Sequence, residues 1–399
     1  MKRAWIVVVV IGLLAAAWAM WPRSGPELRS SLVAAAAPAD AAGFALVRPG
    51  TVPQFPRDHG PHDEYQTEWW YYTGNLQSES GEHFGYQLTF FRRALTPPGQ
   101  RADRTSAWAT DQVYMAHFAL TDVAGGKHAA FEKLARGAGG VAGAQAEPFR
   151  VWLEDWSVTD EGILETAVET AAGVAPYRKP PERLVAAAGD VRLDLQLTDA
   201  KGPVLQGDRG YSQKGEAATN ASIYYSLTHM AATGTVTVRG KTFAVSGLGW
   251  MDHEYSTSAL GSDQAGWDWF SIQLDNDREL MVFQLRRADG SVDEFSNGTL
   301  VAADGSTQRL GPGDFSLQPT GKWRSPRTGA EYPSGWRLEI PAAELTLTIA
   351  PHLADQEMNV SYTYWEGAVS VGGTMGTQMV SGNGYVELTG YAGSMQGQF

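Results

Sequence analysis

The stretch TEWWYYTGNL, residues 67–76, carries the pattern that decides the fold. Aromatic and β-branched residues fill a short run that ends at Gly-Asn, and HFGYQLTFFRR at residues 83–93 repeats the pattern after a Gly-Glu turn. Short runs of this composition, bounded by turn residues, are typical of β-strands. The two runs therefore predict a β-hairpin.

Comparable runs follow along the rest of the chain, separated by turn residues. They include VYMAHFALTD (113–122), VRLDLQLTD (191–199), SIYYSLTHM (222–230), GTVTVRGKTFAVSG (234–247), WDWFSIQLD (267–275), ELMVFQLRR (279–287), VSYTYWEGAVSV (360–371) and YVELTGY (385–391). Helical periodicity is weak, and we expect only short helical pieces near residues 129–134. The sequence predicts an all-β protein built from antiparallel barrels or sandwiches.

Two hairpins that lie far apart in the chain resemble each other. WWYYTGNL (69–76) is similar to WDWFSIQL (267–274), and the strands that follow them, FGYQLTFFRR (84–93) and LMVFQLRR (280–287), both end in Arg-Arg. Self-similarity of this kind indicates duplicated units, although hairpins can also converge by chance. We expect two tandem β-domains, at residues 44–257 and 258–399, with a seam near residues 256–265.

The N-terminus has the pattern of an export segment. Two basic residues precede an unbroken apolar run at residues 4–21, which would be about 27 Å long as a helix at about 1.5 Å per residue. Ala17-Trp18-Ala19 offers a small-x-small cleavage site. Residues 1–21 are therefore predicted to be a cleaved signal peptide or a membrane anchor, and the Ala- and Pro-rich residues 22–43 a tether.

Both alternatives place the rest of the chain outside the cytoplasm, because the basic residues lie on the N-terminal side of the apolar run. We expect a periplasmic or secreted protein, tethered to the inner membrane if the N-terminal helix is retained. Contact with the membrane is expected only through residues 4–21.

The composition excludes several classes of partner and chemistry. The formal net charge is −13 with no lysine- or arginine-rich run, so nucleic acid is not an expected partner. The chain has no cysteine, which removes disulfides, thiolate metal sites and cysteine nucleophiles. Motifs for a serine nucleophile elbow, a zinc protease, a phosphate loop or a dinucleotide site are absent. We expect no cofactor.

A histidine-containing loop precedes the first predicted strand. The segment DHGPHDEY (58–65) places His59 and His62 beside Asp58, Asp63 and Glu64. Several cations accept such a donor set, but the spacing is not diagnostic and a loop before a strand is ordinarily polar. We predict no metal site.

The densest group of ionisable residues is GWMDHEYS (249–256). On a strand, Asp252 and Glu254 share one face with Trp250, while His253 shares the other face with Tyr255. Three adjacent ionisable groups are costly to bury without a function. We predict Asp252, His253 and Glu254 as catalytic candidates; the alternative is that they only bond to loop backbone around an aromatic core.

Aromatic and polar residues recur at alternate positions of several predicted strands. Aromatics with a few acids and imidazoles suit a pocket for a large apolar ligand, and the alternative is an aromatic barrel core. The residues predicted to line such a pocket are Trp69, Tyr71, Gln87, His117, Tyr225, Trp250, Tyr255, Trp267, Trp269, Gln273, Tyr364 and Trp365.

Several motifs occur in a recognisable order over residues 45–399: TEWWYYTGNL with FGYQLTFFR, GLGWMDHEYS with GWDWFSIQLDN, and YWEGAVSV with GYVELTGY. In these motifs the chain resembles the AttH/carotenoid 1,2-hydratase-like family, whose bacterial members are often labelled predicted secreted hydrolases. The resemblance implies two consecutive lipocalin-like β-domains. It also implies a polyene, terpenoid or lipid ligand, because the family includes hydratases that add water to the terminal double bond of an acyclic carotenoid.

The resemblance also implies roles for individual residues. In hydratase chemistry an acid protonates an alkene, aromatic faces hold the tertiary cation, and water adds. By motif match Asp252 would be the acid, and His253 would position water or set the state of the carboxyl group. The aromatic residues implied along the path of the cation are Trp250, Tyr255, Trp267 and Trp269.

The chain departs from the hydratases at this motif. It has Gly-Trp-Met-Asp-His-Glu where they are closer to Gly-Tyr-His-Asp-His, and an export signal does not suit intracellular carotenoid synthesis.

Two hypotheses for the function follow. One is an exported lipocalin-like protein that binds a large apolar ligand and transforms it by hydration or isomerisation, as a hydro-lyase or isomerase. The other is a non-catalytic periplasmic carrier that works with ABC-transporter components. A secreted hydrolase, the usual family label, has no nucleophile motif to support it.

Overall fold

The hairpin predicted at residues 67–93 is present in the computed structural model as β1 (Thr67–Ser78) and β2 (His83–Ala94), with Trp70 opposite Phe90. The structure describes residues 41–162, 169–170, 173–174, 179–257, 260–261 and 263–395. The predicted signal or anchor at 1–21 lies outside these residues, as does the tether at 22–43 except for its last three positions. Among the helices in the described ranges, none has the length and apolar character needed to cross a bilayer.

The first sheet, which we call the N-terminal unit, is antiparallel throughout. Besides β1 and β2 it contains β3 (Gln112–Asp122), β4 (Lys127–Arg136), β5 (Ala142–Ala146), β6 (Phe149–Leu153), β7 (Trp156–Asp160), β10 (Glu182–Ala188), β11 (Val191–Asp199), β12 (Val204–Leu205), β13 (Tyr211–Gln213), β14 (Ala221–Val238) and β15 (Lys241–Ser256). The order is β4-β3-β2-β1-β15-β14-β11-β10-β7-β6-β5, with β12 and β13 paired to β14. Because β6 packs against β2, β3 and β4 from the other end of this order, the sheet curls into a nearly closed barrel.

The second sheet, which we call the C-terminal unit, is also antiparallel. It contains β16 (Gln264–Leu274), β17 (Glu279–Arg287), β18 (Asn297–Val301), β19 (Thr307–Leu310), β20 (Ser316–Pro319), β23 (Trp336–Ile340), β24 (Leu345–Pro351), β25 (Glu357–Asn359), β26 (Thr363–Met375) and β27 (Gln378–Leu388). The order is β19-β18-β17-β16-β27-β26-β24-β23-β20, with β25 paired to β26.

Small elements complete the described structure. Two short hairpins pair β8 (Glu169–Thr170) with β9 (Gly173–Val174) and β21 (Lys322–Arg324) with β22 (Glu331–Pro333). The helical elements are the single 3-10 turns η1 (Arg57–His59), η2 (Pro98–Gln100) and η3 (Pro341–Ala343). The predicted all-β class, with two antiparallel β-units in tandem, is confirmed.

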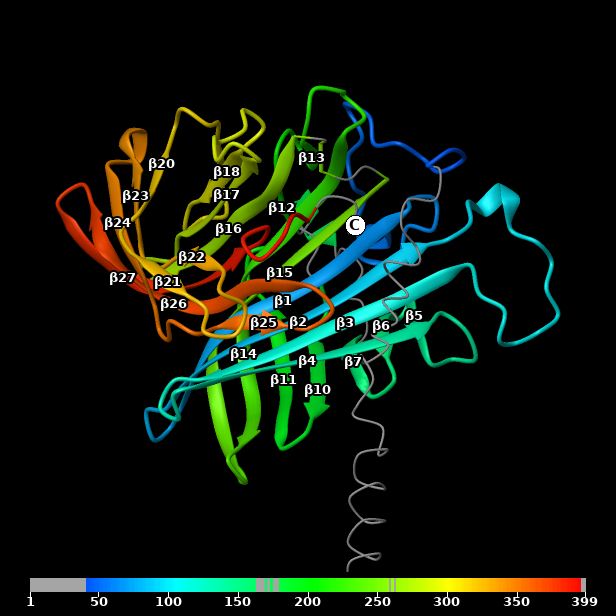
Figure 1. Ribbon diagram of the computed structural model, residues 1–399, viewed down its shortest axis with the longest axis horizontal. Coiled ribbons are helices and arrows are strands. Elements are labelled where there is room, and N and C mark those ends of the chain that lie inside the picture. Colours follow the sequence, from blue (N-terminus) through cyan, green and yellow to red (C-terminus); the bar gives the residue numbers. More distant parts are fainter. Residues whose placement is uncertain are drawn as a thin grey trace, which may run out of the picture.

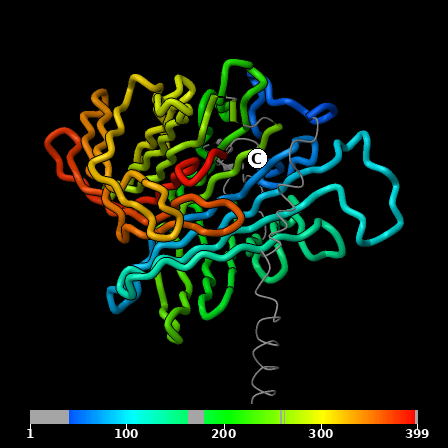
Figure 2. Tube along the Cα trace, viewed as in Figure 1, coloured from blue at the N-terminus to red at the C-terminus, as the bar shows by residue number. Residues whose placement is uncertain are grey.

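The two units occupy different sides of the molecule (Figures 1 and 2). Strands β16 to β27 gather at the upper left of Figure 1, beside the long diagonal strands β1 to β3. The chain passes from one sheet to the other between Ser256, where β15 ends, and Gln264, where β16 begins. The exact domain bounds stay a prediction.

The expectation of helical pieces near residues 129–134 is wrong. This segment belongs to β4, which pairs with β3 along its whole length, Phe131 opposite Phe118. Alanine, glutamate, lysine and leucine favour helix locally, but pairing with a neighbouring strand overrides that preference.

Three of the five apolar clusters among the described residues build the two units and join them. One fills the N-terminal unit around Trp70, Tyr72 and Trp156, and one fills the C-terminal unit around Trp336 and Trp365. The third lies between the units and joins side chains of β1, β14 and β15 to side chains of β16, β17 and β27. Its largest members are Tyr71, Tyr224, Trp250, Trp269, Phe283 and Tyr385. Strand β1 is therefore buried on both faces.

Polar contacts fix the position of one unit against the other. Strand β14 has an irregular register between Leu227 and Met230, and the two residues there, Thr228 and His229, both contact Glu279 of the C-terminal unit. The His229 imidazole lies 2.8 Å from the carboxylate of Glu279, and the Lys201 ammonium is paired with the same carboxylate at 2.8 Å. Glu279 is fully buried, so these partners are needed to compensate its desolvation.

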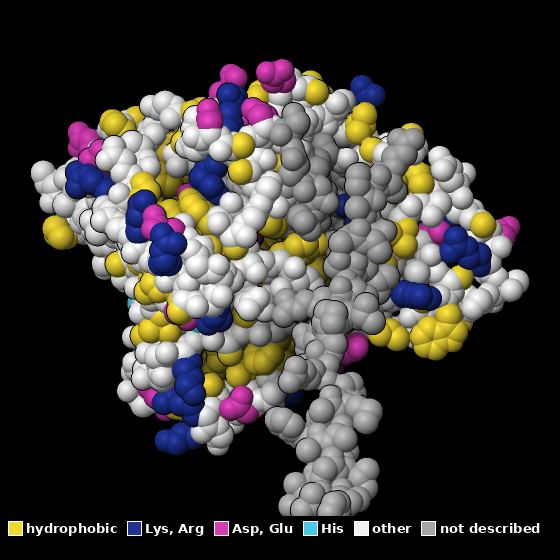
Figure 3. Space-filling model, viewed as in Figure 1, with side chains coloured by type: hydrophobic (Ala, Val, Ile, Leu, Met, Phe, Trp, Pro, Cys, Tyr) yellow, Lys and Arg dark blue, Asp and Glu magenta, His cyan; other side chains and the backbone are white. Residues whose placement is uncertain are grey.

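The visible surface carries no broad field of one charge. On the face drawn in Figure 3, lysine and arginine side chains alternate with aspartate and glutamate side chains over the described residues. This distribution agrees with the absence of a basic run in the sequence.

Close packing between the units leads to the first prediction. A Cβ atom added to Gly85 on β2 would lie 2.4 Å from the Cβ of Ala368 on β26. We expect Gly85→Ala to lower the free energy of unfolding by about 1–3 kcal/mol, because overpacking forces the two sheets apart. Urea denaturation of the full chain measures this effect.

The matched control removes the opposing methyl group. Ala368→Gly relieves the same contact, so the double variant Gly85→Ala, Ala368→Gly should be more stable than the sum of the two single effects predicts. Additive effects would show that these two positions do not limit the approach of the units.

Candidate functional site

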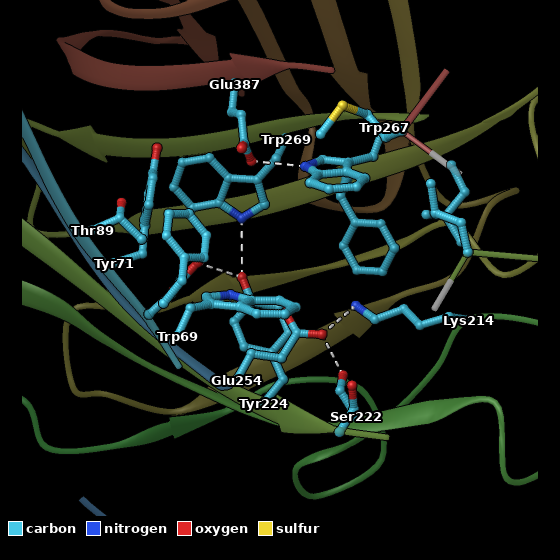
Figure 4. A pocket seen from close by; sticks show the side chains of 17 residues that line it. Trp69, Tyr71, Thr89, Lys214, Ser222, Tyr224, Glu254, Trp267, Trp269 and Glu387 are labelled. Atoms are coloured by element: carbon cyan, nitrogen blue, oxygen red, sulfur yellow. Dashed lines mark hydrogen bonds and ion pairs between the residues drawn. The ribbon is translucent and has the colours of Figure 1, made fainter. Parts of the chain in front are cut away.

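A pocket lies between the two units, and its walls come from both of them (Figure 4). The empty space between the lining side chains is about 1040 Å³, including the part that opens to solvent. The lining residues are Trp69, Tyr71, Thr89, Phe91, Lys214, Ser222, Tyr224, Asp252, Glu254, Ser256, Leu260, Trp267, Trp269, Phe283, Leu285, Glu387 and Met395. Pockets between domains are common ligand sites.

Strand alternation places two of the predicted catalytic residues on this pocket. In β15, Asp252 lies opposite Tyr71 of β1 and Ser226 of β14, and Glu254 lies opposite Trp69 and Tyr224. Residues directly opposite on paired strands share a face. The face that points to the C-terminal unit therefore carries Asp252, Glu254 and the aromatic side chains beside them.

Asp252 is a buried carboxyl group held by three hydrogen-bond donors. The Tyr224 hydroxyl donates to Oδ2 at 2.6 Å, while the Ser226 hydroxyl and the Trp250 indole donate to Oδ1 at 2.5 and 2.7 Å. Burial nevertheless outweighs these donors and raises the pKa of Asp252 to about 7. The carboxyl group can thus both hold and release a proton near neutral pH.

Glu254 and Lys214 form an ion pair at the edge of the same pocket. The Lys214 ammonium lies 3.1 Å from Oε1 of Glu254, and the Ser222 hydroxyl also donates to this oxygen. Lys214 comes from the segment between β13 and β14. It lies opposite the wall that Trp267 and Glu387 form in Figure 4.

The C-terminal unit supplies the opposite wall. The Trp269 indole donates to the Tyr224 hydroxyl at 3.0 Å, which links this wall to the residue that holds Asp252. The Trp267 indole donates to Oε2 of Glu387 at 2.7 Å. Burial raises the pKa of Glu387 to about 7, and the negative charges of Asp252 and Glu254 add to this effect.

A second acid lies behind Glu387. Glu366 of β26 is directly opposite Glu387 of β27 and is almost fully buried. Burial, and then the neighbouring Glu387, hold the pKa of Glu366 well above its usual range. The pocket thus combines aromatic walls with carboxyl groups that stay protonated more readily than carboxyl groups in water.

His253 points away from this pocket. It is fully buried inside the N-terminal unit, with Nε2 2.8 Å from Oε1 of Glu68 and Nδ1 3.1 Å from the Tyr225 hydroxyl. Its ring stacks on Trp70 with centroids 4.9 Å apart. Burial lowers the pKa of His253. The structure therefore separates His253 from Asp252 and Glu254 by the thickness of the sheet.

Glu68 is the centre of a buried ionic network. Arg92 donates to its Oε2 at 2.8 Å, and the imidazoles of His62 and His253 each lie 2.8 Å from its Oε1. Burial alone would lower the pKa of His62, but contacts with the carboxylates of Asp58 and Glu68 outweigh burial and raise it to about 9.

This network contains donor atoms that a metal ion could use. One ligand atom each from His62, Glu68 and His253 lie within 4.8 Å of one another. However, the carboxylate of Glu68 already accepts hydrogen bonds from both imidazoles and is paired with the Arg92 guanidinium. A fixed positive charge beside the carboxylate opposes a metal ion. The donor set is better explained as a structural ionic network.

Some predicted ligand residues lie at contacts between the two units without lining the pocket. Trp250 donates to Asp252 as described, and Gln273 donates to the backbone oxygens of Thr228 and Gly249. His117 and Tyr364 form a hydrogen bond of 2.6 Å between the two units.

Other predicted residues lie inside one unit. Tyr225 bonds with His59 and His253, Tyr255 stacks on His62 with centroids 3.6 Å apart, and Trp365 lies in the core of the C-terminal unit. Gln87 is buried and donates to Thr89. Of the predicted ligand residues, Trp69, Tyr71, Trp267 and Trp269 line the pocket.

Four important residues were not singled out from the sequence. Tyr224 and Ser226 alternate with the selected Tyr225, so a face assignment for SIYYSLTHM could have found them. Glu387 is the one acid in YVELTGY, a segment that the sequence predicts only as a strand. Lys214 lies outside the described strands, so strand alternation could not predict where its side chain points.

Comparisons with known proteins agree with this architecture. A family model described as AttH-like matches residues 46–391. The AttH protein NE1406 from Nitrosomonas europaea is 37% identical, with a TM-score of 0.73, over 87% of this chain and 99% of that chain. Kievitone hydratase from Nectria haematococca is 15% identical, with a TM-score of 0.63, over 88% and 97%. A comparison with curated proteins gives no match. The relatives support a lipocalin-like fold over most of the chain.

The buried network predicts a pH dependence of stability. Because the pKa of His62 in the folded protein is raised from 6.5 to about 9, the stabilisation it gives is complete below about pH 6.5 and is lost as pH rises through about 9. We expect the free energy of unfolding to fall by about 3 kcal/mol over this range. In His62→Gln this alkaline fall should be absent. Urea unfolding at a series of pH values measures both profiles.

A control variant separates this effect from general titration. Burial lowers the pKa of His83 to about 4, so His83 stays neutral over the same range. His83→Gln should keep the alkaline fall. If the free energy of unfolding falls equally with pH in wild type and in His62→Gln, the alkaline fall does not come from His62.

Proposed function

The chain belongs to the AttH-like family, and from this membership and the pocket we propose that it binds a large apolar ligand between its two β-units and transforms it by acid catalysis. The single observation that carries the proposal is Asp252. It is a buried carboxyl group in an aromatic-lined pocket, with its pKa raised to about 7 by burial. A protonated acid beside apolar walls is what protonation of an alkene requires.

The reaction can be written with the residues present. Protonated Asp252 gives its proton to one carbon of the double bond, and a cation forms at the other carbon. Faces of Trp69 and Trp269 stabilise that cation. Water then adds to the cation and returns a proton to the Asp252 carboxylate, which completes a hydration. Loss of a different proton from the cation to Asp252 completes an isomerisation instead.

Kievitone hydratase, by its name, catalyses a hydration. Its fold is similar to that of this chain. At 15% identity the likeness concerns the fold, so the residues of the pocket carry the argument for chemistry.

A second candidate function is a carrier without catalysis. It is favoured by the three donors that hold Asp252, because a fully bonded carboxyl group can be a structural part of the interface. Such a carrier would pass its ligand to ABC-transporter components outside the cytoplasm, with residues 1–21 as signal or anchor. A hydrolase is disfavoured because no histidine lies among the residues that line the described pocket, and the hydroxyl of Ser222 there donates to Glu254.

Binding and turnover can be measured separately. We expect Nile red, a neutral apolar fluorophore, to bind to the purified protein, and Trp269→Ala to weaken its binding about tenfold or more because a pocket wall is removed. Trp108→Ala, at an exposed position, is the matched control and should not change binding. Unchanged binding in Trp269→Ala would place the ligand elsewhere.

Turnover is tested with lycopene and kievitone in water labelled with heavy oxygen, followed by mass spectrometry. We expect labelled product from wild type, and a loss of about 100-fold or more in Asp252→Asn with Nile red binding preserved. Asp289→Asn, in an exposed turn, is the control. Binding without labelled product from either substrate would favour the carrier.

Turnover should also depend on pH in a definite direction. Because Asp252 must be protonated to act, and its pKa is about 7, the rate should be constant below about pH 7 and fall above it. Glu387 also titrates near pH 7. The fall should therefore persist in Glu387→Gln; its disappearance there would transfer the acid role to Glu387.

A further inference from the structure

An ammonium group already occupies one corner of the pocket. The Nζ atom of Lys214 lies 4.2 Å from the ring centroid of Phe283 and 5.2 Å from that of Tyr224. The same atom is 3.1 Å from Oε1 of Glu254. Aromatic faces with a carboxylate form the environment that organic ammonium groups prefer in proteins.

We propose that the pocket takes a ligand with an organic ammonium group joined to an apolar body, and that Lys214 fills the ammonium position until the ligand displaces it. This inference rests on the proposed ligand pocket and adds a cationic group to its apolar ligand; lycopene and kievitone carry no ammonium group and test only the apolar part of that pocket.

The charges around the pocket favour a cation over an anion. Acidic groups come from both walls, Asp252 and Glu254 from β15 and Glu387 from β27, while Lys214 is the one basic residue that lines the described pocket. An anionic group would face these acids, and the lysine that could receive it is already paired with Glu254. A cation would gain both the carboxylates and the aromatic faces.

Lys214 is suited to leave its position. It lies just after β13, and residues 216–218, which follow the buried Gly215, are exposed. Its backbone is bonded at both polar atoms, because its N–H donates to Asn220 O and its carbonyl accepts from Gln264. The four-carbon stem can therefore swing the ammonium into solvent without moving a strand.

The affinity for a cation should rise with pH. The groups that face the cation include two acids, Asp252 and Glu387, whose pKa values burial raises to about 7. Their ionisation above pH 7 adds negative charge to the pocket. Burial keeps the pKa values of the phenols Tyr71 and Tyr224 well above the usual range, so these remain neutral. The charged groups that complete the surroundings are Glu254 and Lys214, which pair with each other. Glu366 lies behind Glu387, and burial holds its pKa well above the usual range, so it favours the neutral form.

The test uses three probes of equal chain length: octyltrimethylammonium, octanol and octanoate, each below its micelle concentration. Isothermal titration calorimetry of the full chain measures their affinities. We expect wild type to bind octyltrimethylammonium more tightly than octanol or octanoate. We also expect its Kd for octyltrimethylammonium to be lower at pH 8 than at pH 6. Each 1.4 kcal/mol of added attraction lowers the Kd about tenfold.

Variants of Lys214 give the decisive comparison. Lys214→Ala vacates the ammonium position, so octyltrimethylammonium should bind about tenfold more tightly. Lys214→Arg keeps a cation in place and should resemble wild type. In the double variant Lys214→Ala, Glu254→Gln the gain should disappear, because the partner carboxylate is lost. Thermal unfolding confirms that each variant is folded.

Two results would overturn the inference. If octanoate binds most tightly and loses affinity in Lys214→Ala, Lys214 is an anion receptor. If the three probes bind equally, or none binds in any variant, the pocket has no preference for a cation. Nile red binding and its loss in Trp269→Ala judge the proposed apolar pocket independently, so failure of the charge preference is distinct from failure of the pocket.

Discussion

The two-residue period of strand β15 is the constraint on which the site depends. Successive side chains of a strand point to opposite faces, so Asp252 and Glu254 reach the pocket between the units while His253 enters the N-terminal unit. A shift of one residue would exchange these environments. Glu68 opposes that shift, because its buried carboxylate binds His253 across the β1–β15 pairing and is itself neutralised by Arg92. The ionic network of Glu68 on one face of β15 thus keeps Asp252 on the opposite face, toward the pocket.

The two units repeat one strand order, which explains the internal likeness in the sequence. The series β4-β3-β2-β1-β15-β14-β11-β10-β7 has the same form as β19-β18-β17-β16-β27-β26-β24-β23-β20. The similar segments lie in β1 and β16, and the strands that follow carry Arg-Arg among their last paired residues, just before Ala94 in β2 and at the end of β17. In each case the first arginine has a buried acidic partner, Glu68 for Arg92 and Asp268 for Arg286. The Arg-Arg pattern therefore marks, in each unit, an arginine whose positive charge is neutralised by a buried carboxylate.

Strand composition was sufficient to predict the all-β class, and alternation correctly separated Asp252 from His253. It could not show which face was the interior, because both faces of β1 and β15 are buried, one by its own barrel and one by the second unit. For this reason the sequence predicts Tyr225 and Trp365 in the same pocket as Trp69 and Trp269, although Tyr225 and Trp365 lie in the cores of the two units. Lys214 could not be predicted to meet Glu254, because their contact arises only when the loop after β13 folds over β15.

The location of the pocket has a physical cause in the N-terminal barrel. Its interior is occupied by large side chains and by a second ionic group, in which Tyr72 and Lys179 both bond to Glu182 at 2.9 Å. In the described part of this barrel, these packed side chains occupy the volume that a ligand of large apolar area would need. Further apolar side chains lie on the outer faces that the two units turn toward each other. The width of the pocket then follows from how closely the units approach, and contacts remote from Asp252, such as Gly85 against Ala368, help to set the shape that a ligand meets.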